Sequence, residues 1–258
     1  MHQPSDGVVV EDVTYPGGDG SPVEAFIVRP AADADPSAPG RAGVLAWHWF
    51  DTQAPDGDRT QFLAEADALA QRGVVSLLPQ GRFPWQAAPS RAIDDIAQIE
   101  AEVARLRLGL DLLAARPDVD AGRLALVGHD FGGMLAAIAA AEETRLRSLV
   151  LVAATPRWGD WFLPFWEIAD NRIDYLRALR PLDPIECIGA AAPAGVLFQF
   201  GRHDFFIAPM SGLEFRAAAP AGATLLAYDD EHAMRLPEVR ADRLAFLART
   251  LELGQGSS

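Results

Sequence analysis

The sequence GHDFGG, residues 128–133, places a carboxylate between an apolar run and an Ala-rich stretch. Residues 124–128 predict a buried strand and residues 131–143 predict a helix, so Asp130 lies at the sharp turn between them. Glycines two positions before and after Asp130 relieve crowding at such a turn, and the start of the helix stabilises a negative charge. Asp130 is therefore a candidate nucleophile, and the alternative is a simple helix N-cap.

Two later loops supply the partners that a nucleophile needs. Asp204, in GRHDFFIAP, follows the seventh predicted strand, and His232, in YDDEHAMR, follows the eighth. A nucleophile is activated by a base, and the base is oriented by a third group. Because the carboxyl ends of parallel strands meet at one edge of a sheet, we expect Asp130, His232 and Asp204 to form a catalytic triad. Asp160, which follows the sixth predicted strand, is the alternative acid.

The elements that position these residues alternate along the chain. Apolar or alternating runs predict strands at 8–15, 23–29, 43–49, 74–78, 124–128, 149–154, 195–201 and 224–228. Helical periodicity separates most of them, and a Pro-Gly-rich turn at 16–20 predicts a hairpin between the first two. This order predicts an α/β fold with about eight strands in a mostly parallel central sheet, flanked by helices, over a single domain at 1–258.

One segment interrupts this rhythm. Residues 155–188 are rich in aromatic residues and prolines and too long for a plain connection. The segment follows the carboxyl end of a strand, where a pocket is expected, so we predict an insertion that forms a lid. Its Trp161, Trp166 and Tyr175 are candidate pocket residues, and the alternative is a helix packed on the sheet.

The order of nucleophile, acid and histidine, together with the GHDFGG turn, resembles the α/β-hydrolase superfamily over nearly the whole chain. AWHWFD at 46–51 and GRHDFFIAP at 201–209 are similar to stretches of the dienelactone hydrolase family. The resemblance implies an α/β-hydrolase fold and hydrolysis without a cofactor or a metal. It also implies that the oxyanion hole is built from the backbone N–H groups of Trp49 and Phe131.

The residue at the turn departs from that family. Dienelactone hydrolases carry Cys there and related esterases carry Ser, whereas Asp resembles epoxide hydrolases and haloalkane dehalogenases. A carboxylate that attacks an ester gives an anhydride, but one that attacks an sp³ carbon gives an alkyl ester. Water activated by His232 would then hydrolyse that ester at the carboxyl carbon of Asp130.

The leaving group is less constrained by the sequence. An epoxide oxygen needs a proton donor, for which Tyr175 and His48 are candidates, whereas a halide needs N–H donors such as the indoles of Trp49, Trp161 and Trp166. Haloalkane dehalogenases often carry Trp after the nucleophile, and this chain carries Phe, so the sequence narrowly favours an epoxide. Two other functions stay open: ester or lactone hydrolysis in the dienelactone manner, and a binding protein on a hydrolase scaffold.

Composition limits the partners. A formal net charge of −14 disfavours binding to nucleic acid or to an anionic membrane, so we expect a small, mostly apolar substrate. Arg82 is a candidate contact for a substrate carboxylate, and a solvated salt bridge is its alternative. Cys187 is the only cysteine, so no intrachain disulfide forms, which fits a cytoplasmic protein. The sequence is compatible with a monomer or a homodimer.

Overall fold

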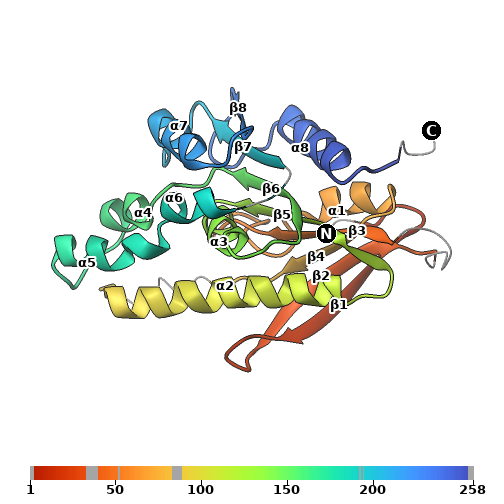
Figure 1. Ribbon diagram of the computed structural model, residues 1–258, viewed down its shortest axis with the longest axis horizontal. Helices are drawn as coiled ribbons and strands as arrows, with labels where there is room; N and C mark the ends of the chain where they lie inside the picture. Colours follow the sequence, from red (N-terminus) through yellow and green to blue (C-terminus); the bar gives the residue numbers. More distant parts are fainter. Residues whose placement is uncertain are drawn as a thin grey trace.

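The computed structural model describes residues 3–32, 40–51, 53–82, 89–191, 193 and 195–254. Within them, one eight-stranded sheet has the strand order β1-β2-β4-β3-β5-β6-β7-β8 (Figure 1). The pairs β1–β2 and β2–β4 are antiparallel, and the remaining neighbours are parallel. The prediction of a mostly parallel sheet of about eight strands is confirmed, including the first hairpin.

The strands lie close to their predicted positions. Their bounds are β1 Val8–Pro16, β2 Pro22–Pro30, β3 Arg41–Trp47, β4 Val75–Pro79, β5 Val119–His129, β6 Leu146–Val152, β7 Gly195–Gly201 and β8 Thr224–Tyr228. The longer helices are α1 Leu63–Ala70, α2 Ala92–Ala114, α3 Phe131–Ala140, α7 Pro209–Ala218 and α8 Pro237–Thr250.

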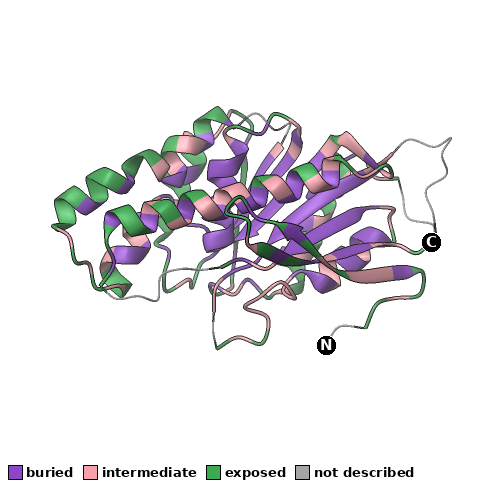
Figure 2. Cartoon of the chain, turned by 90° about the horizontal axis from the view of Figure 1, so that it is seen from below, coloured by how far each residue is buried: buried purple, intermediate pink, exposed green. Residues whose placement is uncertain are grey.

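Helices cover both faces of the sheet. Helices α1 and α8 contact each other and pack on one face, while α2, α3 and α7 pack on the other (Figure 1). The central strands β3 to β7 form the buried centre of the molecule, whereas the edge strands β1 and β8 are more exposed (Figure 2). None of the helices in the described ranges is both long and apolar enough to cross a membrane.

Helix α3 is apolar on every side, as its Ala-rich sequence predicts. All of its residues are buried, because it lies between the sheet, α2 and α6. A helix that is hydrophobic all round is stable only when it is enclosed in this way. Its amino-terminal end is thereby held at the carboxyl end of β5, in the middle of the sheet.

The segment 155–188 folds into short helices beyond the end of β6. They are α4 Trp158–Phe165, α5 Arg172–Leu179, η1 Arg180–Leu182 and α6 Pro184–Cys187, followed by η2 Ile188–Ala190. Helix α5 packs on α2, and α6 packs on α3. Pro164 lies near the end of α4, and the chain is extended at Trp166. The segment thus lies on the edge of the sheet where the carboxyl ends of the parallel strands meet.

Candidate active site

Asp130 occupies a strained turn between β5 and α3. Its φ of 54° and ψ of −121° are sparsely populated for a residue with a side chain. A Cβ atom on Gly128 would lie 2.3 Å from the carbonyl oxygen of Gly132, and one on Gly132 would lie 2.5 Å from the carbonyl oxygen of His48. Both glycines are therefore required by close backbone contacts, and they hold Asp130 at the edge of the sheet.

The structure brings the three predicted triad residues together. His232 Nδ1 donates to Asp204 Oδ2 at 2.8 Å, and His232 Nε2 lies 3.6 Å from Asp130 Oδ1. The other oxygen of Asp204 accepts the amides of Phe206 and Ile207, which fixes the carboxylate that orients the histidine. Asp160, the alternative acid, lies on α4 with one buried oxygen unpartnered, and the contacts of His232 are with Asp204 and Asp130.

The two carboxylate oxygens of Asp130 have different surroundings. Oδ2 lies 3.4 Å from the amide nitrogen of Phe50, and the neighbouring Phe131 backbone lowers the pKa of the carboxyl in part. Oδ1 is buried without a hydrogen-bond partner and faces His232. Asp130 makes no side-chain capping bond to α3, so a helix cap does not explain its position.

Charge in this site is concentrated on the Asp130–His232–Asp204 row. Burial raises the pKa of Asp130, and the neighbouring His232 offsets part of this rise. Burial alone would lower the pKa of His232, but the nearby carboxylates of Asp130 and Asp204, the latter hydrogen-bonded to Nδ1, outweigh it and raise that pKa to about 9. At neutral pH the imidazole is therefore cationic between two carboxylates, and it favours the ionised form of Asp130.

Trp49 does not face Asp130 as the resemblance implies. The Trp49 amide donates to Gln61 Oε1 at 2.8 Å, and the Trp49 indole donates to the carbonyl of Asp56 at 3.1 Å. Neither donor of Trp49 therefore faces Asp130. The amide of the next residue, Phe50, faces Asp130 instead, and Phe131, the other residue implied by the resemblance, directly follows Asp130 at the start of α3.

His48 explains why Phe50 replaces Trp49. Nδ1 of His48 donates to the carbonyl of Trp49 at 2.6 Å, and its Nε2 accepts the amide of Gly81 at 2.9 Å. In a trans peptide the C=O and the following N–H point in opposite directions, so anchoring the Trp49 carbonyl aims the Phe50 N–H at Asp130. Burial lowers the pKa of His48 to about 4. With both ring nitrogens engaged by backbone, His48 does not serve the pocket as predicted.

Two other predicted pocket residues are directed elsewhere. The Tyr175 hydroxyl donates to Asp95 Oδ2 at 2.6 Å, and its side chain is fully buried between α5 and α2. The exposed Arg82 donates to the carbonyl of Pro22 at 3.1 Å, and its amide donates to Glu102. Tyr175 and Arg82 are therefore held by partners that the sequence did not identify. Neither side chain is directed at Asp130.

Aromatic side chains enclose the site. Trp161 of α4 lies with its ring centroid 5.0 Å from Phe131 and 5.8 Å from His232, and it stacks on Phe206 at 4.9 Å. The Trp166 ring meets Phe131 edge-on at 6.3 Å. The Trp161 indole nitrogen is buried and has no hydrogen-bond partner. The insertion thus contributes two of its three predicted aromatic residues to the walls around a fully buried Asp130.

Comparison with known proteins identifies this architecture. No protein-family model matches the chain. An α/β-hydrolase from Penicillium sp. sh18 superposes with a TM-score of 0.68 at 14% identity, over 95% of this chain and 100% of that one. The chain has the α/β-hydrolase fold.

Other solved structures with this fold are equally distant in sequence. An acetyl xylan esterase from Paenibacillus sp. R4 has a TM-score of 0.73 at 19% identity, covering 96% of this chain and 86% of that one. A protein provisionally assigned as a dienelactone hydrolase, from Klebsiella pneumoniae, has a TM-score of 0.68 at 17% identity, covering 96% and 99%. At such identities the likeness establishes the hydrolase fold, and the chemistry has to be argued from the site.

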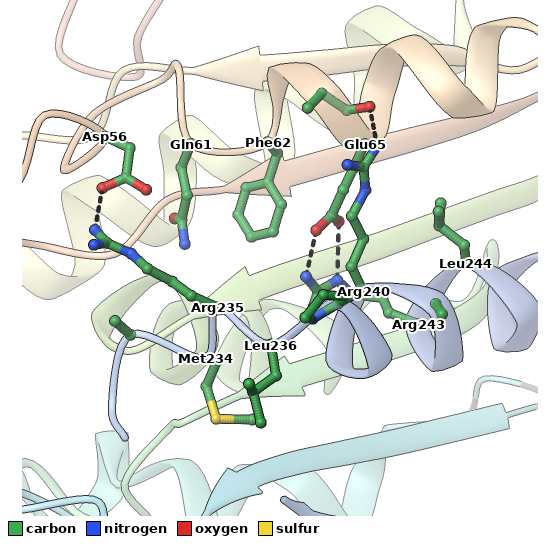
Figure 3. Close-up of a pocket in the computed structure, with 14 residues that line it drawn as sticks. Asp56, Gln61, Phe62, Glu65, Met234, Arg235, Leu236, Arg240, Arg243 and Leu244 are labelled. Atoms are coloured by element: carbon green, nitrogen blue, oxygen red, sulfur yellow. Dashed lines mark hydrogen bonds and ion pairs between the residues drawn. The ribbon is translucent and has the colours of Figure 1, made fainter. Parts of the chain in front are cut away.

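A separate pocket of about 660 Å³ lies behind the His232 loop, between α1 and α8 (Figure 3). Neither Asp130 nor Asp204 lines it. Its Arg235 pairs with Asp56, and its Arg243 pairs with Glu65, so much of its charge is neutralised within the wall. We therefore place the chemistry at Asp130 and not in this pocket.

Sequence reasoning missed two residues near the site, Phe50 and Gln61, and it expected His129 only to pack beside the turn. Gln61 Nε2 contacts His129 Nδ1 at 2.5 Å, and His129 Nε2 contacts the carbonyl of His232 at 2.9 Å. Gln61 carries no local signal, because its partners lie far away along the chain. The peptide geometry that selects Phe50 depends on a contact of His48 with backbone, which no sequence pattern reveals.

Proposed function

We propose that this protein is a hydrolase that cleaves a bond from an sp³ carbon to a leaving group through an alkyl ester of Asp130. The observation that carries the proposal is the asymmetry of the Asp130 carboxylate. Its Oδ2 lies against the amide of Phe50, and its Oδ1 has no hydrogen-bond partner and faces His232. Oδ2 is thus in position to become the carbonyl oxygen of an ester whose hydrolysis places a negative charge there.

The same asymmetry argues against Asp130 as the nucleophile toward an ester. The oxygen of an ester substrate would need backbone amides such as that of Phe50 when it becomes an oxyanion, yet Oδ2 of Asp130 already lies against the Phe50 amide. A substrate with a saturated reacting carbon makes no such demand in the first step. Oxyanion stabilisation is then needed only in the second step, on the oxygen of Asp130 itself.

The proposed sequence of bonds is balanced. Oδ1 of Asp130 forms a bond to the substrate carbon while the leaving group departs with its electron pair. Water then attacks the carboxyl carbon of Asp130, and His232 Nε2 accepts its proton. The tetrahedral intermediate breaks the bond to Oδ1, the departing alcohol oxygen takes the proton from His232, and the regenerated carboxyl of Asp130 ionises.

Forming the ester also prepares the base. While Asp130 is ionised, it helps to raise the pKa of His232 to about 9. Alkylation removes the negative charge of Asp130 and leaves Asp204 as the carboxylate paired with the histidine. The pKa of His232 then falls, because burial continues to disfavour the cation. The cationic ring releases its proton to solvent as the leaving group departs, so His232 becomes a neutral and competent base after the nucleophile has reacted. The proton that the regenerated carboxyl of Asp130 releases restores the cation.

The described contacts favour a halide over the epoxide that the sequence narrowly suggests. The proposed proton donors for an epoxide, Tyr175 and His48, are engaged by Asp95 and by backbone. Trp161 instead offers a buried, unpartnered indole N–H beside Phe131. An indole stabilises a departing anion by hydrogen bonding but does not protonate an alkoxide, so a halide needs nothing further from this wall.

Entry to the site requires movement of its aromatic wall. Asp130 is fully buried, and Trp161 and Phe206 lie against His232. The lid proposed for residues 155–188 would expose Asp130 when α4 and its Trp161 move away. The predominance of aromatic carbon around the carboxylate favours a small, mostly apolar substrate, with no cofactor in the chemistry.

The decisive experiment is a single turnover in ¹⁸O-labelled water with small haloalkanes and epoxides, followed by mass spectrometry of the peptide that contains Asp130. We expect haloalkane consumption and heavy oxygen in Asp130, because water attacks its carboxyl carbon. Consumption without label in that peptide would overturn the alkyl-ester route. The matched control is Asp130→Asn, which retains the shape of the side chain and should not react in the first turnover.

Ester or lactone hydrolysis is the second candidate, since the solved structures with this fold include an acetyl xylan esterase and a provisional dienelactone hydrolase. In that case Asp130 would act with His232 on a water molecule that attacks the substrate directly. The same experiment separates the two, because an activated ester would be consumed while Asp130 stays unlabelled. Binding without turnover of any panel member would favour a non-catalytic scaffold.

A further inference from the structure

A partly buried chain of side-chain hydrogen bonds joins two loops of the site that share no strand contact. It begins at the Trp49 amide, which donates to Gln61 Oε1 at 2.8 Å, and continues from Gln61 Nε2 to His129 Nδ1 at 2.5 Å. It ends where His129 Nε2 meets the carbonyl of His232 at 2.9 Å. We propose that Gln61 and His129 are positioning residues. They hold His232 and the loop at residues 48–51, here called the oxyanion loop, in fixed relation to Asp130.

The direction of this chain is determined at both ends. The Trp49 amide only donates, so the Gln61 oxygen must face it and the Gln61 nitrogen must face His129. The His232 carbonyl only accepts, so His129 must carry its proton on Nε2 and accept at Nδ1. Burial lowers the pKa of His129 well below its ordinary value, which agrees with a neutral ring. Each hydrogen bond is thus satisfied in one tautomer only.

The topology explains why such a connection is needed. The oxyanion loop follows β3 and the His232 loop follows β8, and β5, β6 and β7 lie between these strands. Backbone hydrogen bonds of the sheet therefore cannot set the distance between Phe50 and His232 directly. His129 is the last residue of β5 and immediately precedes Asp130. The hydrogen bond from its ring to the His232 carbonyl therefore fixes the position of His232 relative to the strand that carries the nucleophile.

Packing keeps the ring of His129 in this orientation. The ring stacks on the Trp49 indole at 5.2 Å with an interplanar angle of 2°, and its centroid lies 5.7 Å from that of His232. Gln61 lies at the wall of the pocket behind the His232 loop (Figure 3). The clamp, defined as Gln61 and His129, therefore connects that wall with the catalytic row without touching the reacting atoms.

The first test measures the pKa of His232 by NMR titration of labelled histidines in the full chain, with no substrate. Gln61→Leu breaks the chain, so His232 moves relative to Asp130 and its pKa falls by about one unit or more. Gln71→Leu, an exposed change beyond the end of α1, is the matched control and leaves the pKa of His232 unchanged. An unchanged pKa of His232 in folded Gln61→Leu would overturn the inference.

A second variant tests the direction in which donors and acceptors alternate along this chain of hydrogen bonds. In Gln61→Glu one carboxylate oxygen still accepts the Trp49 amide, but the other can only accept from His129. We expect His129 to gain a proton at Nδ1, so its pKa rises into the range where it titrates, and the new cation lowers the pKa of His232. A purely structural role would not produce this signature, and a His129 that stays neutral to acid pH would contradict the chain.

Coupling between the two residues completes the test. If they act as one chain, Gln61→Leu combined with His129→Phe shifts the pKa of His232 no further than either change alone. In His129→Gln the new amide can still donate to the His232 carbonyl. The pKa of His232 should therefore stay closer to that of the unmodified protein than it does in His129→Phe. Additive effects would refute a single chain. The roles of Phe50 and His232 rest on the proposed function, but these titrations do not, so either can fail separately.

Discussion

Two His–Asp pairs in this protein have nearly the same geometry and different surroundings. His232 and Asp204 lie 2.8 Å apart, and His203 and Asp229 lie 2.6 Å apart. The side chains of the first pair are 8% and 1% exposed, whereas those of the second are 63% and 77% exposed. Both pairs therefore have a close His–Asp contact. The candidate catalytic pair differs because it is buried and lies beside a second carboxylate, that of Asp130.

Burial changes what the contact does. In water the attraction between an exposed pair is screened, and such pairs contribute little. In the enclosed site the imidazole interacts with two carboxylates, and this raises the pKa of His232 to about 9 despite desolvation. The exposed pair therefore supplies the control variants for the tests of His232 and Asp204, because His203 is the sequence neighbour of Asp204 but faces solvent.

The largest expected difference is between His232→Gln and His203→Gln. Removing the proposed base should lower turnover by roughly 10⁶-fold, as for a histidine of a hydrolytic triad. The alkyl ester on Asp130 should then accumulate, which intact-protein mass spectrometry detects after mixing with substrate. His203→Gln should match the unmodified protein. If both variants lose activity equally, burial is not what separates the two pairs.

A smaller effect is expected from Asp204→Asn compared with Asp229→Asn. Loss of the orienting carboxylate should reduce turnover by roughly 10⁴-fold, because the imidazole loses its tautomer and part of its charge stabilisation. The pKa of His232 should also fall from about 9, since Asp204 is one of the two groups that raise it. Steady-state rates and NMR titrations of the histidines check both expectations. Asp229→Asn should change neither the turnover rate nor the pKa of His232.

Trp161→Phe tests the wall that buries the first pair. We expect turnover to fall by roughly tenfold, the value of a single lost hydrogen bond to a departing anion, with a greater loss for chloride than for bromide substrates. Trp158→Phe removes an indole bonded to the carbonyl of Leu182 and is the matched control. Equal losses in both variants would indicate a packing effect instead of a leaving-group contact.

The smallest effect concerns stability against pH. The pKa of His232 is raised in the folded protein, so its contribution to stability is complete below about pH 6.5 and is lost as the pH rises through about 9. The midpoint of thermal unfolding should therefore fall across this interval in the unmodified protein and in His203→Gln. His232→Gln should flatten the slope, and an unchanged slope would show that the ion pairs of His232 do not couple to folding.

Much of the fold followed from local patterns. Buried apolar runs such as those of β3 and β5 fit only a parallel sheet covered on both faces, and the Ala-rich run after Asp130 fits only an enclosed helix. Helix α7 was not predicted, because its sequence Pro209–Ala218 leaves Met210 and Leu213 exposed and has a weak amphipathic pattern. Tertiary contact with β7, β8 and α6 outweighs that signal.

Site residues divide along the same line. Asp130, Asp204 and His232 could be found in the sequence because each follows a strand end, and parallel strands bring such ends together. Tyr175 and His48 were misassigned because their partners, Asp95 and the Trp49 carbonyl, depend on helix packing and on peptide orientation. Phe50 was missed for the same reason, because the orientation of the peptide between Trp49 and Phe50 decides which amide N–H faces Asp130.

The sequence by itself therefore determined the order of strands and helices, the strained turn at Asp130 and the residues at three strand ends. These follow from periodicity, from glycine at close contacts and from chain direction, all of which are local. Only the tertiary structure decided that the Phe50 amide faces Asp130, that the indole of Trp161 lacks a partner and how His129 connects to His232. Such contacts join residues far apart in the chain, and their geometry depends on packing that no local pattern encodes.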